Sequence, residues 1–125
     1  MTKSSTTVQL KGLVEYNSDC ESKTLIETAK LPVVVFFTAP WCMACKSFSP
    51  ILDQLGEELS KKAVIIKIDI DENPLLAAEH HIRSLPTIMV FVKGDVVDTK
   101  IGVSTKGDML NFINGAKWSN WFPAT

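Results

Sequence analysis

The chain has 125 residues, the usual size of one domain, and this length predicts a single hydrophobic core. Apolar residues make up 46% and charged residues 22%, a globular composition that excludes disordered, collagen-like and low-complexity proteins. Thirteen Lys and Arg against 14 Asp and Glu give a net charge of -1, so charge gives no reason to expect binding to nucleic acid or to an anionic membrane.

The beginning of the chain is rich in Ser and Thr, and residues 1–7 are expected to form a flexible tail. No apolar run long enough for a signal peptide or a membrane helix follows, which favours the cytoplasm over export. Three cysteines are an odd number, which does not fit a framework of structural bridges, and two of them form Cys42-Met43-Ala44-Cys45. In a reducing compartment such a pair is more often catalytic, redox-sensing or metal-binding.

Hydrophobic patterns of period 2 and of period 3.6 alternate along the chain and predict an α/β protein. Strands are expected at 8–11 with 13–16, 33–37, 63–70, 87–92 and 96–101, and helices at about 20–29, 42–59, 74–80 and 105–116. Asn17, Ser18 and Asp19 are candidate N-caps of the first helix, and Ser104 or Thr105 of the last. The order is βαβαβαββα, with a parallel βαβ crossover, a final hairpin turning at Gly94, and one α/β layer sandwich.

The cysteine pair is the strongest candidate for a reactive site. Cys42 is predicted to start the helix over 42–59, where unpaired backbone N–H groups stabilise a thiolate, the form of cysteine that attacks disulfides. Cys45 lies one helical turn further and can attack a mixed disulfide on Cys42, which releases the substrate as a thiol. Zinc is the alternative ligand, but no second pair follows, and His80 and His81 are adjacent without the spacing of zinc ligands. We therefore expect no metal and no other cofactor.

Several separated motifs together resemble the thioredoxin family. Ala39-Pro-Trp-Cys-Met-Ala-Cys-Lys46 resembles the family's active-site stretch, and Ile82-Arg-Ser-Leu-Pro-Thr87 resembles the loop before its cis-proline. Further agreement in order and spacing comes from Pro50, Lys67, Asp71-Glu-Asn-Pro74, Gly94 and Gly102. The resemblance implies the thioredoxin fold, a central mixed β-sheet flanked by helices, over residues 8–116, followed by an aromatic C-terminal tail at 117–125.

The resemblance also implies an activity and its partners. It implies a protein-disulfide reductase that works by reversible dithiol-disulfide exchange, with Cys42 as nucleophile and Cys45 as resolver. Implied partners are disulfide-containing proteins and a thioredoxin reductase as electron donor, and we expect a cytoplasmic monomer that serves electron transport and cell redox homeostasis. The implied substrate-binding residues are Trp41, Met43, Ala44, Leu85, Pro86 and Gly102, and Lys67 is a supporting residue near the cysteines, unless it is a strand-end lysine that reaches solvent.

The physics of the second loop supports a peptide groove. A cis bond before Pro86 would leave the backbone of Leu85 free to pair with an extended peptide, whereas the alternative is a trans-proline that enters an edge strand. Trp41, just before a helix, is expected to be partly exposed, although a core position is the alternative. Gly102 most simply lets another backbone approach.

The sequence departs from the family pattern in three ways, at four residues. Met43-Ala44 replaces the usual Gly-Pro, which leaves two N–H groups directed at the Cys42 sulfur and an apolar side chain at the rim. Phe36 stands where the family usually buries an Asp, so that carboxylate for proton transfer is missing, and Thr38 replaces the usual Trp. Two alternatives stay open: a more oxidising or specialised disulfide exchanger, which Met43-Ala44 permits, and a non-enzymatic binding module that uses the groove and the Trp-rich tail.

Two further features have no assigned role. Cys20 is predicted near a helix N-terminus, away from the apolar face formed by Leu25 and Ile26, as either an inert surface cysteine or a regulatory thiol. Aromatic residues of the C-terminal tail recur at helical spacing and either pack on the domain or form a docking patch; they are Trp118, Trp121 and Phe122.

Overall fold

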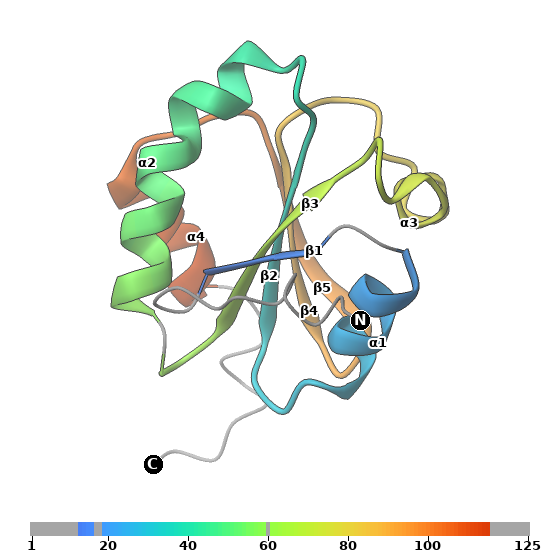
Figure 1. The fold of residues 1–125 in the computed structure, drawn as a ribbon. Helices are drawn as coiled ribbons and strands as arrows, with labels where there is room; N and C mark the ends of the chain where they lie inside the picture. The colour runs from blue at the N-terminus through green and yellow to red at the C-terminus, as the bar shows by residue number, and fades with distance from the viewer. Residues whose placement is uncertain (1–12, 17–18, 60, 116–125) are drawn as a thin grey trace.

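The computed structural model describes residues 13–16, 19–59 and 61–115 (Figure 1). The elements in chain order are β1 (Leu13–Tyr16), α1 (Asp19–Thr28), β2 (Val33–Thr38), α2 (Met43–Glu58), β3 (Val64–Asp69), α3 (Pro74–Glu79), β4 (Thr87–Val92), β5 (Asp95–Ile101) and α4 (Lys106–Gly115). This order confirms the predicted βαβαβαββα arrangement. The strand segment expected at 8–11, the two tails and the aromatic residues Trp118, Trp121 and Phe122 lie outside the described residues.

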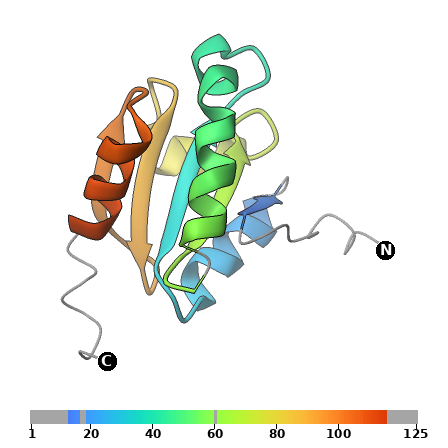
Figure 2. The ribbon, with the colours of Figure 1, turned by 90° about the vertical axis from the view of Figure 1, so that its left-hand side faces the viewer.

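The strands form one mixed sheet in the order β1-β3-β2-β4-β5. β2 pairs in parallel with β3 and antiparallel with β4, so it lies in the middle of the sheet. In Figures 1 and 2, α2 and α4 cover one face of the sheet, and α1 and α3 lie on the other. The continuous apolar run of β2 follows from this position, because a central strand with both faces covered has no polar side.

Alternation along β2 divides the core between the two faces of the sheet. Val34 and Phe36 belong to a buried cluster with α2 and α4, which also contains Cys42 and Cys45. Val35 and Phe37 belong to a second cluster with Ile26 of α1 and with α3. One strand therefore connects the packing of all four helices.

Helix capping follows the sequence in one case and departs from it in another. Thr105 caps α4, since its Oγ1 accepts a hydrogen bond from Asp108 N at 3.1 Å. The prediction that Asp19 caps its own helix is wrong. Its carboxylate accepts hydrogen bonds from Leu75 N (3.2 Å) and Leu76 N (2.8 Å), which are unpaired N–H groups in the first turn of α3. Asp19 thus joins two helices that are distant in sequence; Asn17 and Ser18 lie outside the described residues.

The final hairpin turns at the predicted glycine. Lys93 and Gly94 both have positive φ, 54° and 89°, and Val92 pairs with Asp95 across the turn. Positive φ at both central positions gives a turn whose twist matches that of the strands. β5 therefore begins at Asp95, one residue earlier than predicted.

His80 ends α3 and packs its ring against the core. The ring centroid lies 5.2 Å from that of Phe91, edge to face, and 6.4 Å from that of Phe37. Burial lowers the pKa of His80 below its ordinary value of 6.5, helped by Lys23 and His81 and opposed by the negative charge of Glu79. Both sequence and structure place His80 and His81 at a helix end, and His80 has a packing role.

We predict that His80 makes stability depend on pH below neutrality. Because its folded pKa lies below the unfolded value, the unfolded state takes up the proton first as pH falls. The contribution of neutral His80 is complete above pH 6.5 and is lost as pH falls from there through the folded pKa. Denaturant unfolding should show that the free energy of unfolding falls less between pH 7.5 and pH 5 for His80→Leu than for the wild type. His81→Asn is the control, and an equal loss in His80→Leu would contradict the prediction.

Candidate active site

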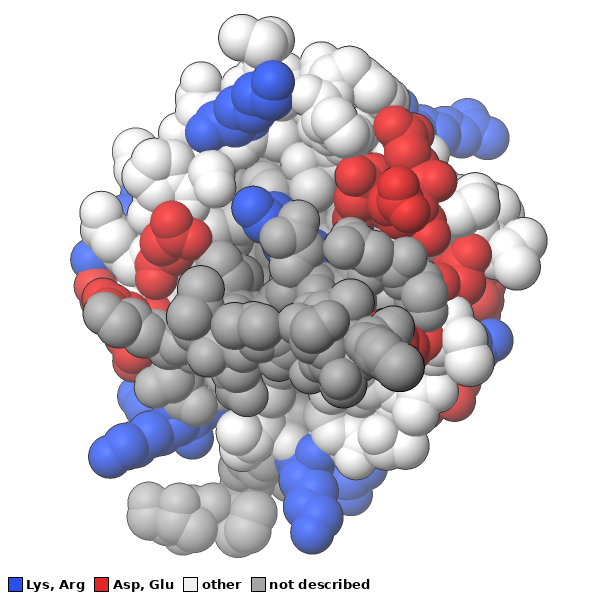
Figure 3. Space-filling view, viewed as in Figure 1, with Lys and Arg blue, Asp and Glu red and all other residues white. Residues whose placement is uncertain are grey.

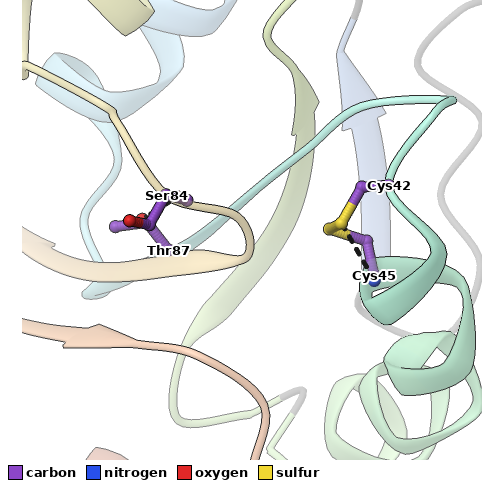
Figure 4. Close-up of a disulfide and its surroundings, with 4 residues drawn as sticks. All are labelled: Cys42, Cys45, Ser84 and Thr87. Atoms are coloured by element: carbon purple, nitrogen blue, oxygen red, sulfur yellow. Dashed lines mark hydrogen bonds between the residues drawn. A yellow bond between two sulfur atoms is a disulfide. The ribbon is translucent and has the colours of Figure 1, made fainter.

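The two cysteines meet at the first turn of α2. Cys42 is the N-cap of the helix, with φ −91° and ψ 105°, and Cys45 lies in its first turn. They form a disulfide with a Cα–Cα distance of 5.3 Å (Figure 4). The Sγ of Cys42 accepts a hydrogen bond from Cys45 N at 3.1 Å. The sequence suggested that the N–H groups of Met43 and Ala44 are directed at this sulfur, whereas the donor in the structure is Cys45. The reason is geometric, because an N-cap side chain commonly reaches the N–H group three residues further along.

The sulfur atoms are buried beneath an exposed rim. Cys42 is 7% exposed and Cys45 3%, whereas Trp41 is 64% and Met43 72% exposed. The expectation that Trp41 is exposed is therefore confirmed. Its indole Nε1 donates a hydrogen bond to Asp71 Oδ2 at 3.2 Å, which holds the ring from the loop after β3. This contact was not predicted, because nothing local in the sequence links residues 30 positions apart.

The proline loop lies at the same end of the sheet as the cysteines. Phe37 of β2 pairs with Thr87 of β4, so the residues that leave β2 and those that enter β4 are neighbours. The Leu85–Pro86 peptide bond is cis, as predicted. Thr87 Oγ1 donates a hydrogen bond to Ser84 O at 2.6 Å across the loop (Figure 4), and Leu85 packs against the cluster that contains both cysteines.

Gly102 extends this surface from β5. Its φ is +95°, a conformation that favours glycine, and its N–H group donates a hydrogen bond to Pro86 O at 2.9 Å. A Cβ at this position would meet nothing within 4 Å, so open space lies beside the backbone. This open space leaves room for the approach of another backbone, which is the role that the sequence suggested for Gly102.

Phe36 is buried on the sheet face that α2 covers. It is 1% exposed, belongs to the same buried cluster as Cys42 and Cys45, and its ring centroid lies 5.5 Å from that of Phe48. An aromatic ring therefore packs at the position where the sequence comparison placed a missing carboxylate. The local environment of the pair on this side is apolar.

A cavity of about 470 Å³ opens on another side of Cys45. Its lining combines the end of β2, the first turns of α2 and the end of β3: Thr38, Ala39, Pro40, Cys45, Lys46, Ser49, Lys67 and Asp69. Lys67 thus borders the same cavity as Cys45. Asp69 was missed, although the alternation of a strand places it on the same face as Lys67 and that signal was available in the sequence.

Charge on the molecular surface is mixed. On the face shown in Figure 3, acidic side chains gather between the end of β3 and α3, and Lys and Arg side chains are scattered over the face and its outline. Within the described ranges, no helix is long and apolar enough to cross a membrane. Those ranges also contain no group of three or more His, Cys, Asp or Glu side chains placed to hold a metal ion.

Cys20 lies away from this site. It is exposed on α1 and borders a hollow of about 390 Å³ between α1 and α3. These helices cover the sheet face opposite α2 (Figure 2), so Cys20 is separated from the cysteine pair by the sheet. The prediction of a surface cysteine is confirmed.

A redox-capable Cys-x-x-Cys pair at a helix start, next to a cis-proline loop in a mixed α/β sheet, defines the class of dithiol-disulfide exchange proteins with a thioredoxin fold. The thioredoxin family model matches residues 14–115. Similar proteins include a thioredoxin of Rickettsia felis, 44% identical over 78% of this chain and 92% of the relative, and one of Haemophilus influenzae, 35% identical over 78% and 91%. The solved structure of a point-mutant thioredoxin from Halobacterium salinarum is similar with a TM-score of 0.75 and 26% identity, over 87% of this chain and 94% of that one.

This chain belongs to the thioredoxin family. Its close cysteine pair and its relatives make it a thiol-disulfide oxidoreductase, and the family acts on protein disulfides.

We predict that a carboxylate in place of Phe36 destabilises the protein in a pH-dependent way. Burial raises the pKa of an Asp at position 36 above its unfolded value of about 3.9, and Lys67, paired with Phe36 in the sheet, moderates the rise. The free energy of unfolding of the variant is therefore highest below the unfolded pKa, where the carboxyl is protonated in both states, and it falls as pH rises through the folded pKa. Phe36→Asp should therefore lose more stability at pH 8 than at pH 5, beyond a packing loss of about 3 kcal/mol or more.

Phe36→Leu is the matched control, because it removes the ring without adding a charge. Denaturant unfolding of both variants at the two pH values separates the electrostatic effect from the packing effect. The compared quantity is the loss of unfolding free energy relative to the wild type. If the difference in this loss between Phe36→Asp and Phe36→Leu is the same at pH 5 and at pH 8, the carboxyl is not held in an apolar environment.

Proposed function

We propose that this protein reduces disulfides in other proteins, with Cys42 as nucleophile and Cys45 as resolver. The thiolate of Cys42 attacks one substrate sulfur, a Cys42–substrate disulfide forms, and the other substrate sulfur leaves with the electron pair. Cys45 then attacks Cys42 Sγ, forms the Cys42–Cys45 bond and releases the second substrate sulfur. The substrate gains two electrons and two protons, and the protein loses them. The single observation that carries the proposal is the Cys42–Cys45 disulfide at the N-terminus of α2.

The order of the two cysteines follows from their places on α2. Cys42 is the N-cap, where the helix dipole and free N–H groups favour a negative charge, and its Sγ receives the N–H group of Cys45. Cys45 lies inside the helix and is the more deeply buried of the two. A sulfur that starts the reaction needs thiolate character and access from outside, and both favour Cys42.

The surface around the pair supports an extended peptide as substrate. Trp41 and Met43 provide exposed apolar contacts, and Ala44 is also exposed beside them. On the opposite side, Leu85 and Pro86 precede β4, with the open space of Gly102 next to them. We assign Trp41, Met43, Ala44, Leu85, Pro86 and Gly102 to substrate binding, with the backbone of Leu85 pairing with the peptide.

The cycle requires an electron donor that reduces the Cys42–Cys45 disulfide. Membership of the thioredoxin family supports a thioredoxin reductase in this role. The reaction then transfers electrons from the reductase to protein disulfides, which places the protein in electron transport and cell redox homeostasis. We assign it to the cytoplasm as a monomer, where a reducing environment keeps the dithiol available.

We predict that the two cysteine variants fail in different ways. Cys42→Ser should abolish reduction of protein disulfides, because no nucleophile remains. Cys45→Ser should accumulate a mixed disulfide with substrate, because attack survives and resolution does not. Both variants are made with Cys20→Ser, since exposed Cys20 could form disulfides of its own. Non-reducing electrophoresis after incubation with a disulfide-containing protein gives the readout, and equal trapping by both variants would contradict the assigned roles.

The direction of exchange is tested by insulin reduction with and without a thioredoxin reductase. Reduction that depends on the reductase, together with a redox potential near roughly −270 mV, supports a reductant, whereas about −180 mV indicates a more oxidising exchanger. The exposed Met43 side chain and Ala44, which lie between the cysteines, make this measurement necessary. Full biological activity in a variant with both Cys42→Ser and Cys45→Ser would instead indicate a binding module.

A further inference from the structure

The resolving step requires a proton to leave a buried thiol. Cys45 is 3% exposed in the described structure, and a thiol attacks a disulfide only after it becomes a thiolate. Phe36 and Phe48 pack in the same buried cluster as Cys45, and neither side chain accepts a proton. The proton must therefore leave on another side.

The cavity of about 470 Å³ beside Cys45 provides that side. It is large enough for several water molecules, since one water occupies roughly 30 Å³ in the liquid. Its polar lining comes from Thr38 and Ser49 and from three charged residues, Lys46, Lys67 and Asp69. A polar, solvent-sized space next to a buried thiol can conduct a proton through water.

The sheet register places Asp69 in this cavity. Phe36 pairs with Lys67 and Thr38 pairs with Asp69 across β2 and β3. Because side chains alternate along a strand, Lys67 and Asp69 point to the same face as Ile65, which lies in the cluster covered by α2. The small Thr38 side chain stands directly beside Asp69, and the cavity extends from this pair to Cys45.

We propose that Asp69 is the proton acceptor for Cys45, acting through water in this cavity. Among the charged residues that line it, Asp69 is the carboxylate, and a lysine ammonium has no free electron pair with which to accept a proton. Lys46 and Lys67 instead add positive charge that favours the Cys45 thiolate. Asp69 Oδ1 receives the N–H group of Asp71 at 2.8 Å, which fixes the carboxylate while leaving it a second oxygen.

The step balances without any further reactant. The proton of Cys45 passes through water to the Asp69 carboxylate, and the thiolate attacks Sγ of Cys42 in the mixed disulfide. The Cys45–Cys42 bond forms, the bond between Cys42 and the substrate breaks, and its electron pair leaves on the substrate sulfur, which can take the proton back. The inference rests on the proposed function, because it assumes that Cys45 is the resolver.

Stopped-flow reaction with excess 5,5′-dithiobis(2-nitrobenzoate) isolates this step. All proteins carry Cys20→Ser, so that only the active-site pair reacts. Attack by Cys42 releases the first thionitrobenzoate at a rate proportional to reagent concentration, and attack by Cys45 releases the second at a rate independent of it. Asp69→Asn keeps an oxygen that can accept the Asp71 N–H group, so it removes the proton acceptor with little structural change.

We predict that Asp69→Asn slows the second phase at pH 7 by at least about tenfold and leaves the first phase unchanged. The difference should shrink as the pH rises towards 9, because hydroxide can then take the Cys45 proton in place of Asp69. Asp53→Asn, an exposed change on the same helix as Cys45, should leave both phases unchanged. Thr38→Trp, which fills the cavity, should slow the second phase at pH 7 and provides the test if Asp69→Asn does not fold.

Several results would overturn the proposal. One is a second phase that a folded Asp69→Asn leaves unchanged or, where Asp69→Asn does not fold, that Thr38→Trp leaves unchanged. Another is a slowing of equal size at every pH, which would indicate a structural effect. If the Cys20→Ser protein that keeps Asp69 shows no second phase, Cys45 is not the resolver and the proposed function fails. This outcome differs from a normal second phase that Asp69→Asn leaves unchanged, which refutes only the role of Asp69.

Discussion

β2 lies between β3 and β4 with a layer of helices on each face, and Val33–Phe37 are each at most 1% exposed. Burying a Val or Phe side chain stabilises a protein by about 1.5 to 3 kcal/mol, so this strand is held firmly in place. The chain leaves β2 at Thr38 and reaches Cys42 four residues later, where α2 begins. The position of the cysteine pair therefore depends on the burial of this one strand, and the pairing of Phe37 with Thr87 brings the proline loop to the same end of the sheet.

The active site combines an apolar foundation with a polar opening. Phe36 packs in the same buried cluster as the cysteines, where a buried carboxylate would cost desolvation energy, and this favours stability of the fold. The reaction still has to move a proton to and from Cys45. The cavity lined by Lys67 and Asp69 offers polar groups on a different side of the sulfur, so the two requirements are met by different neighbours of the same residue.

Contacts between distant segments hold the rim of the site. Asp71, in the loop after β3, accepts a hydrogen bond from the indole of Trp41. The same loop is held to α1, because Ser22 Oγ donates a hydrogen bond to Asn73 Oδ1 at 2.8 Å. Asn73 Nδ2 in turn donates a hydrogen bond to Asp69 O at 2.9 Å. Buried hydrogen bonds of this kind are costly to break, since each leaves a polar group without water. The exposed rim of the site is thus connected to the helix on the opposite face of the sheet.

The cis peptide bond before Pro86 was expected from the resemblance of its loop to that of the thioredoxin family. Local patterns in the sequence were sufficient for the order of elements, the start of α2 at Cys42 and the hairpin turn at Gly94. These features depend on neighbouring residues, because hydrophobic period, caps and turns are set within a few positions of the chain. Tertiary structure alone decided that Asp19 caps α3 and that Asp71 holds Trp41. It also brought Asp69 and Thr38 together beside Cys45, because strand pairing and helix packing, which join residues far apart in sequence, determine which polar groups share a cavity.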